Sequence, residues 1–209
     1  MARAPSFCGV ILAAGESSRM GRDKALLTWP PGGRSTFLSS TIELLQVHSD
    51  MVLVVAGKNA ESITPVVDAS AAFLAENRHP ERGQFSSLQT GLQEVLNRGR
   101  DAAIVALVDR PPAQPGTLTR LCEAFRYAYE NDKWAVVPEF DGRHGHPFII
   151  GREMIEAFLR APATSTARDV EHSFAARIVY VPVADPNVVA NVDTPEDYER
   201  VCRSWVQVS

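Results

Sequence analysis

A polar loop that contains Arg19 and Lys24 follows the first apolar run of the chain. The run 7–14 has the length and β-branched content of a buried strand, and the segment after it, from Gly15 to Lys24, carries hydroxyl groups and Arg19. Backbone N–H groups at the tip of such a loop suit phosphate oxygens, Arg19 can contact two oxygens at once, and Lys24 adds a point charge. The pattern predicts a phosphate-binding loop, although its spacing is that of neither standard nucleotide-binding glycine motif.

Two aspartates stand where strands are expected to end. Asp109 follows the apolar run 102–108, and Asp193 precedes a helix start in which capping explains residues 194–197 but does not require Asp193. A carboxylate at the end of a central parallel strand lies at the edge where α/β sheets bind ligands. We therefore predict that Asp109 and Asp193 share a Mg²⁺ ion that bridges phosphate oxygens. The alternative is that Asp109 caps the helix expected near Pro115, although a capping residue would stand closer to that proline.

Two histidines lie in the turn-rich insert 141–147. His144 and His146 are two residues apart, and no third metal ligand is near them in the sequence, so we exclude a zinc site. The residue types around them are typical of an exposed turn, which we expect for His144 and which is the alternative for His146.

Apolar runs and amphipathic segments alternate along most of the chain, which predicts a three-layer α/β/α fold with a mostly parallel central sheet. The length of 209 residues fits a single domain, residues 1–209. Strands are expected at 7–14, 51–56, 71–74, 102–108, 134–138, 148–150 and 177–183, and helices at 36–48, 59–68, 86–98, 116–131, 152–159 and 194–205, with a short one from 167.

The composition of the chain argues against several classes of protein. Hydrophobic residues make up 45% and charged residues 22% of the chain, which is normal for a globular protein. The net charge of −4 without a basic cluster argues against a nucleic-acid-binding protein, and no apolar run reaches the length of a membrane span. The 3 cysteines are scattered and odd in number, so we expect reduced thiols and a cytoplasmic protein.

The pattern Leu-Ala-Ala-Gly-x-Ser-x-Arg-Met-Gly-x-x-Lys over residues 12–24 resembles the signature of the molybdenum cofactor nucleotidyltransferases. These belong to the wider group of sugar-phosphate nucleotidyltransferases, so the resemblance implies a Rossmann-like nucleotidyltransferase fold. It also implies that Asp109 and Asp193 are the two metal-binding aspartates, with Mg²⁺ as cofactor, and that Arg19, Lys24 and Asp109 are catalytic. The residues that it implies in nucleotide binding within this signature are Leu12, Ala13, Ala14, Gly15, Arg19 and Lys24.

The resemblance extends to two further segments. Asn77 and the run Gly83-Gln-Phe-Ser86-Ser87-Leu resemble the family's second nucleotide-binding segment, where the base is read, although helix capping alone would explain one of the serines. The group Gly145-His146-Pro147 resembles the part that faces the acceptor substrate. We expect Arg168 to reach the acceptor phosphate, and the alternative for it is an ordinary surface charge.

The family transfers a nucleoside monophosphate from a nucleoside triphosphate to a phosphate of a second substrate and releases pyrophosphate. The Leu-Ala-Ala-Gly and Gly-Gln-Phe-Ser-Ser runs resemble the cytidylyl branch, which implies CTP and molybdopterin as substrates and a client molybdoenzyme as a further partner.

Two departures from the family pattern bear on the substrates. Arg110 replaces the usual glutamine after Asp109, which leaves the acceptor open, and Asn191 replaces an aspartate two residues before Asp193, which removes a negative charge from the predicted metal site. The alternatives are guanylyl transfer to molybdopterin, transfer to a sugar or alditol phosphate, and a non-enzymatic protein that binds and delivers the molybdenum cofactor.

Overall fold

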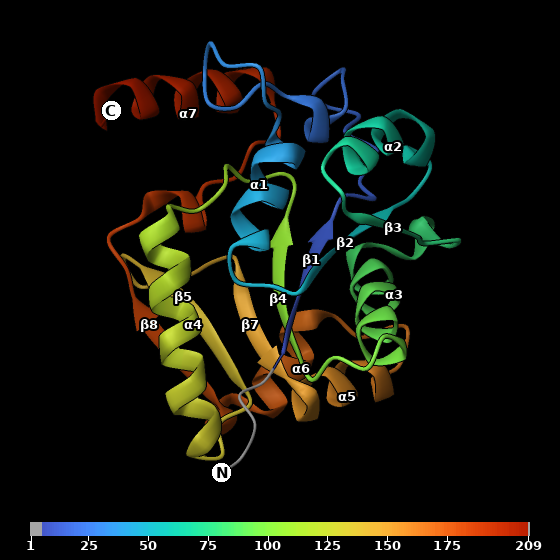
Figure 1. Cartoon of the computed structure of the whole chain (residues 1–209), viewed down its shortest axis with the longest axis vertical. Coiled ribbons are helices and arrows are strands. Elements are labelled where there is room, and N and C mark those ends of the chain that lie inside the picture. Colours follow the sequence, from blue (N-terminus) through green and yellow to red (C-terminus); the bar gives the residue numbers. More distant parts are fainter. Residues whose placement is uncertain (1–5, 209) are drawn as a thin grey trace.

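The strands form one sheet in the part of the chain that the structure describes. The structure is a computed structural model and describes residues 6–208, in which eight strands pair in the order β3-β2-β1-β4-β7-β5-β6, with β8 paired to β5 (Figure 1). The strands are β1 (Phe7–Leu12), β2 (Met51–Ala56), β3 (Phe73–Glu76), β4 (Ala102–Leu107), β5 (Ala135–Phe140), β6 (Arg143–His144), β7 (Phe148–Gly151) and β8 (Ile178–Pro182).

The sheet is mostly parallel, as predicted. Strands β1 to β4 run parallel, β8 runs parallel to β5, and β7 is antiparallel to both β4 and β5. All six residues of β1 and of β4 are buried, as expected for apolar strands covered on both faces. The reversal at β7 follows from its short connection to β5, because a few residues can join antiparallel strands but cannot make a parallel crossover.

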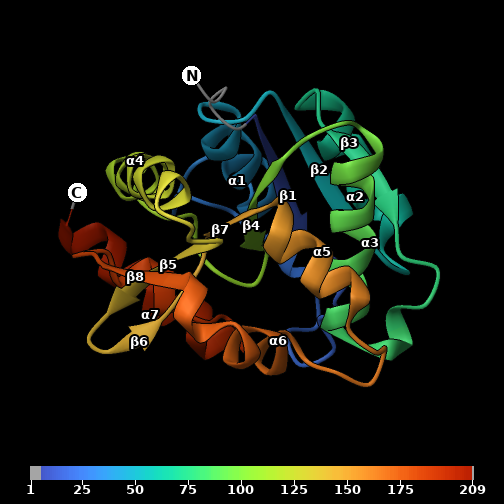
Figure 2. The same ribbon diagram turned by 90° about the horizontal axis from the view of Figure 1, so that it is seen from below.

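Helices cover both faces of the sheet, which confirms the three-layer architecture (Figure 2). Side chains of β1 alternate between the two layers, with Ile11 in one core and Val10 in the other. One face is covered by α1 (Phe37–Gln46), α2 (Ala60–Ala69) and α4 (Pro115–Glu130), and the other by α3 (Gln84–Asn97), α5 (Arg152–Arg160) and α6 (Ala167–Ser173).

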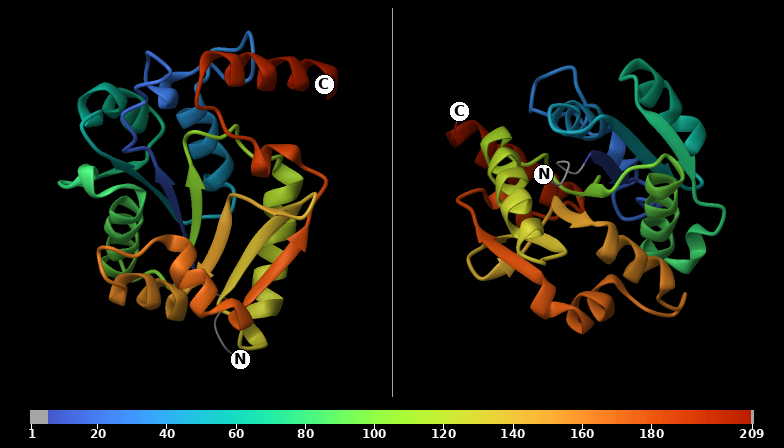
Figure 3. Two further views of the ribbon diagram at one scale, coloured as in Figure 1. Left: turned by 180° about the vertical axis from the view of Figure 1, so that it is seen from behind. Right: turned by 60° about the horizontal axis from the view of Figure 1, so that its bottom comes forward.

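The last helix, α7 (Pro195–Val208), lies across the carboxyl end of the sheet, beside the segment that follows β1 (Figures 1 and 3). A separate small core of Met20, Leu27, Trp29, Phe37, Val192 and Val201 joins that segment to the start of α7. The connections also contain four short 3-10 helices, η1 (Lys24–Leu26), η2 (Pro80–Arg82), η3 (Ala175–Arg177) and η4 (Pro186–Val189). This packing brings residues from the two ends of the chain to one edge of the sheet.

Helix and strand ends follow local chemistry. Thr36 caps α1 by accepting the Ser39 N–H, and Thr194 accepts the Asp197 N–H at the start of α7. The prediction of a third strand at 71–74 is wrong at its start, because Ala72 donates its N–H to Val67 and so completes the end of α2.

The structure removes the capping alternative for Asp109. Helix α4 starts after Gln114, whose N–H donates to the Asp185 carboxylate at 2.7 Å. The cysteines are free thiols, with Cys8 and Cys122 buried and Cys202 half-buried. Over residues 6–208, no helix has the length and apolar character needed to cross a membrane.

Candidate active site

The loop after β1 is fastened at both ends. At its start, Ala13 donates its N–H to the Val55 carbonyl at 2.8 Å. The side-chain amide of Asn59 then donates to the Ala13 carbonyl at 2.9 Å and to the Asp23 carboxylate at 2.8 Å. These bonds tie the first and last residues of the loop to the segment after β2, so the loop backbone has a fixed place at the edge of the sheet.

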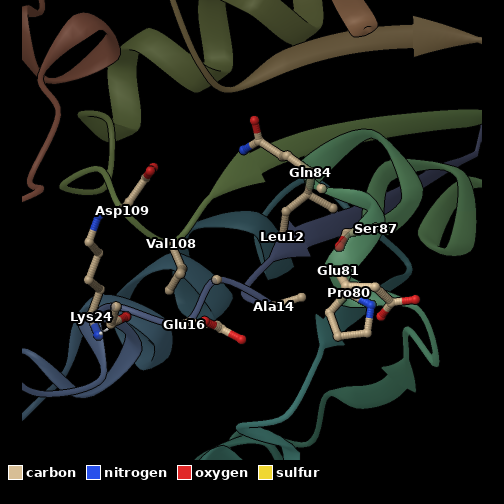
Figure 4. A pocket seen from close by; sticks show the side chains of 13 residues that line it. Leu12, Ala14, Glu16, Lys24, Pro80, Glu81, Gln84, Ser87, Val108 and Asp109 are labelled. Atoms are coloured by element: carbon tan, nitrogen blue, oxygen red, sulfur yellow. Dashed lines mark hydrogen bonds between the residues drawn. The ribbon is translucent and has the colours of Figure 1, made fainter. Parts of the chain in front are cut away.

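Lys24 joins this loop to the far end of the chain. Its Nζ atom lies 2.6 Å from Oδ1 of Asp193, and its side chain is only 12% exposed. Arg19 also reaches Asp193, at 3.2 Å, but its side chain is 70% exposed. Next to Asp193, Val192 donates its N–H to the Asp109 carbonyl at 2.9 Å. The predicted grouping of the loop with the segments that carry Asp109 and Asp193 is therefore present, and Figure 4 shows Lys24 extending toward Asp109.

The two aspartates have different environments. Burial raises the pKa of Asp109 above its usual range, and the nearby Lys24 acts against this effect. Within residues 6–208, the buried Oδ1 atom of Asp109 has no hydrogen-bond partner. The hydrogen bond from Lys24 instead lowers the pKa of Asp193, and the side-chain amide of Asn191 donates to the other oxygen of Asp193. A carboxylate without a partner beside one that is held by a lysine leaves room for an added cation.

The residues described form no group of three or more His, Cys, Asp or Glu side chains that would hold a metal ion. Mg²⁺ commonly uses one or two carboxylates together with substrate phosphates and water. The pair Asp109 and Asp193 fits that pattern. It does not fit a site made of protein ligands alone.

A cavity of about 580 Å³ opens between the loop and the start of α3, which is within the usual range for a nucleotide-sized ligand (Figure 4). Of the residues predicted to bind nucleotide or metal, its lining includes Leu12, Ala14, Gly15, Lys24, Gly83, Ser87 and Asp109. Ala13 is buried beside it, and Arg19 lies outside its lining.

Asn77 lies behind the cavity wall. It is buried, and its side-chain amide donates to the hydroxyls of Ser86 and Ser87 at 2.9 and 3.0 Å. Its oxygen accepts the His79 N–H. Of these residues, only Ser87 lines the cavity. The arrangement fits a positioning role for Asn77, which sets the orientation of Ser87.

Gly83 makes the turn into α3 possible. Its φ of 87° lies in the left-handed region, which side chains with a Cβ atom rarely adopt. The turn places the first residues of α3, including Gln84, on the cavity wall.

The three residues predicted to bind the acceptor differ in burial and in whether they line a cavity. Gly145 is buried, and a Cβ atom there would lie 2.2 Å from the Val188 carbonyl oxygen, so the close approach of two backbone segments explains the glycine. His146 is half-buried and lines a second cavity, whereas Arg168 is exposed on α6 and lies outside the cavity linings. The alternative of an exposed turn does not hold for His146, whereas His144 is exposed as expected but belongs to strand β6.

Comparison with known proteins identifies the family. Residues 9–178 match the model of the MobA-like NTP transferase domain. The chain belongs to this family. As a MobA-like NTP transferase it is a nucleotidyltransferase, as predicted, and its sheet and helices have the Rossmann-like arrangement of such enzymes.

A relative from Mycobacterium ulcerans, named as a probable molybdenum cofactor guanylyltransferase, is 31% identical over 93% of this chain and 92% of its own length. Among solved structures, Rv0371c from Mycobacterium tuberculosis H37Rv superposes with a TM-score of 0.77, at 23% identity, over 96% of this chain and all of its own. A complex of Rv0371c with manganese superposes with a TM-score of 0.67, at 22% identity, over 95% of this chain and 99% of its own. At these identities, the structural matches establish the fold.

Two residues of this site carry no local sign of their role. Asn59 has the position of a helix start, yet it fastens the loop, and Gln84 lines both cavities. Asn59 stands directly after Gly57-Lys58 at the end of β2, the strand next to β1. A polar side chain at the end of a neighbouring parallel strand was the available signal.

Proposed function

We propose that this chain transfers a nucleoside monophosphate from a nucleoside triphosphate to the phosphate of molybdopterin, with release of pyrophosphate. The observation that carries the proposal is the contact of Lys24 with Asp193, next to Asp109, where Lys24 and Asp109 line a cavity large enough for a nucleotide. A protein that only carries a cofactor has no need of two carboxylates beside a phosphate-binding loop. The names of the curated relatives support molybdopterin as the acceptor.

The chain's residues suit the binding of two anionic substrates. The acceptor phosphate has a second pKa of about 6, so it is already a nucleophile near neutral pH and needs no general base. The loop amides, Lys24 and Arg19 would hold the triphosphate and place its α-phosphorus in line with the acceptor phosphate. His146 and Arg168 would orient the acceptor, with Gly145 letting the His146 segment pack against η4.

Asp109 and Asp193 would hold a divalent cation, for which we propose Mg²⁺. The buried, unpartnered oxygen of Asp109 supports this assignment, and so does the manganese complex of the related fold. A divalent cation held by these carboxylates would neutralise negative charge on the substrate phosphates. Because Lys24 occupies Asp193 in this structure, the lysine must shift its contact from the carboxylate to the triphosphate as the substrates bind.

For the base we propose cytosine. Ala14 lines the cavity, and its methyl group takes up space that a glycine at this position would leave to the ligand. A smaller cavity favours a pyrimidine over a purine. Guanine is the second candidate, because the relatives at 28% to 31% identity are named as guanylyltransferases.

Thermal shifts with CTP, GTP, ATP and UTP, each with and without Mg²⁺, test this proposal. A ligand at about a hundred times its Kd stabilises the folded state by roughly 2.7 kcal/mol, which is readily measured. We expect the largest Mg²⁺-dependent shift with CTP and a gain in the GTP shift in Ala14→Gly. A larger shift with GTP in the unmodified chain would select the guanylyl alternative, and no shift with any nucleotide would contradict the proposed reaction.

A further inference from the structure

A second cavity adjoins the nucleotide cavity. It also has a volume of about 580 Å³, and the two cavities share Leu12, Gly83 and Gln84 in their linings. A group bound in the second cavity would therefore lie directly beside a nucleotide bound in the first. The position fits the second substrate of a transfer reaction.

The lining of this second cavity combines buried apolar side chains with polar ones, among them Arg82 and His146. Leu107 comes from β4, Phe148 from β7, and Phe85 and Leu88 from α3. All four side chains are at most 8% exposed, so the structure holds them in place. Rigid apolar and aromatic walls suit a flat ring system.

One carboxylate lies in this lining, together with the guanidinium of Arg82. Among the residues described there, Glu171 on α6 is the only acidic side chain of the second cavity. It is half-buried, and among the described side chains its carboxylate has no hydrogen bond or ion pair. Its charged neighbours are Arg168 and His172 on its own helix and His144 on β6, and burial raises the pKa of Glu171 in spite of them.

A partly desolvated carboxylate without a partner costs free energy that a ligand with matching donors would recover. An ionised carboxylate is an acceptor at both oxygens, so it fits two adjacent N–H donors on one edge of a ring. The 2-amino-4-oxopteridine ring has such an edge, formed by its amino group and the neighbouring ring N–H.

We propose that Glu171 is a specificity residue that binds the amino and ring N–H edge of a 2-amino-4-oxopteridine in the second cavity. This inference rests on the proposed function, because it assigns the ring of the phosphorylated acceptor to that cavity. Guanine has a similar edge. The phosphate-binding Lys24 and the carboxylate of Asp109 line only the first cavity, however, whereas Glu171 lines only the second. The positions therefore favour the acceptor ring over the base.

The test compares two ring compounds by fluorescence titration. 6-Hydroxymethylpterin carries the amino group, and 6-hydroxymethyllumazine has an oxo group in its place. We expect the unmodified chain to bind the pterin at least about tenfold more tightly, because the lumazine oxygen would face the carboxylate. Glu171→Gln should lose this preference, since an amide can donate to the oxo group. The control Glu199→Gln changes an exposed residue of α7 and should keep it.

Steady-state kinetics show whether Glu171 binds the pterin ring of the acceptor or the guanine base of the nucleotide. With molybdopterin as acceptor, Glu171→Gln should raise the KM for molybdopterin and leave the KM for the nucleoside triphosphate unchanged. A raised KM for GTP alone would assign Glu171 to the base and overturn the proposal, as would an unchanged pterin preference in Glu171→Gln. If the unmodified chain shows the pterin preference but no transfer with any nucleotide, the proposed function fails while the ring site stands.

Discussion

The carboxylate of Asp109 lowers the stability of the folded chain but could bind a cation. Its carboxylate is half-buried, one oxygen lacks a partner within residues 6–208, and burial raises its pKa. Each of these features disfavours the charged form in the protein without ligands. A divalent cation between Asp109 and the substrate phosphates would favour the charged form instead. Asp109 therefore suits the binding of a cation and does not stabilise the fold.

The variant Asp109→Asn tests this trade-off. It keeps the shape of the side chain but removes the charge, so we expect turnover to fall by about 10³-fold or more. The Tm without ligands should be equal to or higher than that of the unmodified chain, because a desolvated charge has been removed. Asp68→Asn, at an exposed position of α2, is the control and should change neither quantity. A large loss of Tm in Asp109→Asn would mean that the carboxylate stabilises the fold.

The contacts of Lys24 and Arg19 with Asp193 indicate that Mg²⁺ binds together with the nucleoside triphosphate and not before it. Both contact Asp193 in this structure, so an added cation must compete with two positive charges for that carboxylate. We expect Mg²⁺ alone to give little thermal shift, and Mg²⁺ with a nucleoside triphosphate to give more than the sum of the separate shifts. Removal of Mg²⁺ by a chelator should reduce the nucleotide shift to its value without the metal. A strong shift with Mg²⁺ alone would contradict this competition.

At the scale of elements, the loop after β1 owes its position to the neighbouring strand. Asn59, after β2, bonds to Ala13 and Asp23 at the two ends of the loop, while Ser17 accepts the Lys24 N–H within it. The loop amides can thus be arranged before a nucleotide arrives, which reduces the entropy lost on binding.

Replacement of this anchor should weaken nucleotide binding without removing any residue of the cavity lining. For Asn59→Ala we expect a loss of about 1–2 kcal/mol in the free energy of unfolding and a higher KM for the nucleoside triphosphate, with kcat less affected. Urea denaturation and steady-state kinetics measure the two effects. Asn97→Ala is the control, because the Asn97 side chain bonds only to exposed groups of its own helix. An unchanged KM in Asn59→Ala would show that the loop holds its position by other contacts.

Much of the fold, and part of the site, follows from local sequence. The apolar runs that became β1, β2 and β4 need burial on both faces, and Thr36 and Thr194 mark helix starts by hydrogen bonds over three residues. Asp109 and Asp193 were recognised because each follows or precedes an element in a way that local structure does not explain.

The remaining features depend on contacts between distant segments. The glycine at position 145 is required by the Val188 backbone, and Glu171 faces a cavity whose walls come from β1, β4, β7 and α3. The His146 segment is likewise held by a distant part of the chain, because the His146 N–H donates to the Val188 carbonyl at 2.8 Å. Local patterns contain no information on such approaches, so the residue types around His146 indicate only an exposed turn, and its predicted role beside the acceptor comes from the resemblance alone.

At the scale of the whole molecule, His146 makes the free energy of unfolding depend on pH. Burial, with the positive charge of Arg110 adding to it, lowers the pKa of His146 from 6.5 to about 3. Between about pH 3 and pH 6.5, His146 binds a proton in the unfolded chain but not in the folded chain. Its contribution to the free energy of unfolding is therefore fully present above pH 6.5 and is lost as the pH falls below that value.

Urea unfolding at pH 7.5 and 5.5 measures this effect. We expect a loss of roughly 1.4 kcal/mol from this group at pH 5.5, and a smaller loss in His146→Gln. The control His172→Gln, at an exposed position of α6, should behave like the unmodified chain. Equal losses in the His146→Gln and unmodified chains would show that His146 is protonated in the folded state.

The proposed reaction is tested most directly by its products. The purified chain is incubated with Mg²⁺, molybdopterin and equal concentrations of CTP and GTP, pyrophosphate release is followed, and the dinucleotide is identified by mass spectrometry. We expect pyrophosphate in step with a cytosine dinucleotide, and neither product with Asp109→Asn. A guanine dinucleotide as the main product would contradict the assignment of the base, and absence of pyrophosphate with either nucleotide would contradict nucleotidyl transfer to molybdopterin.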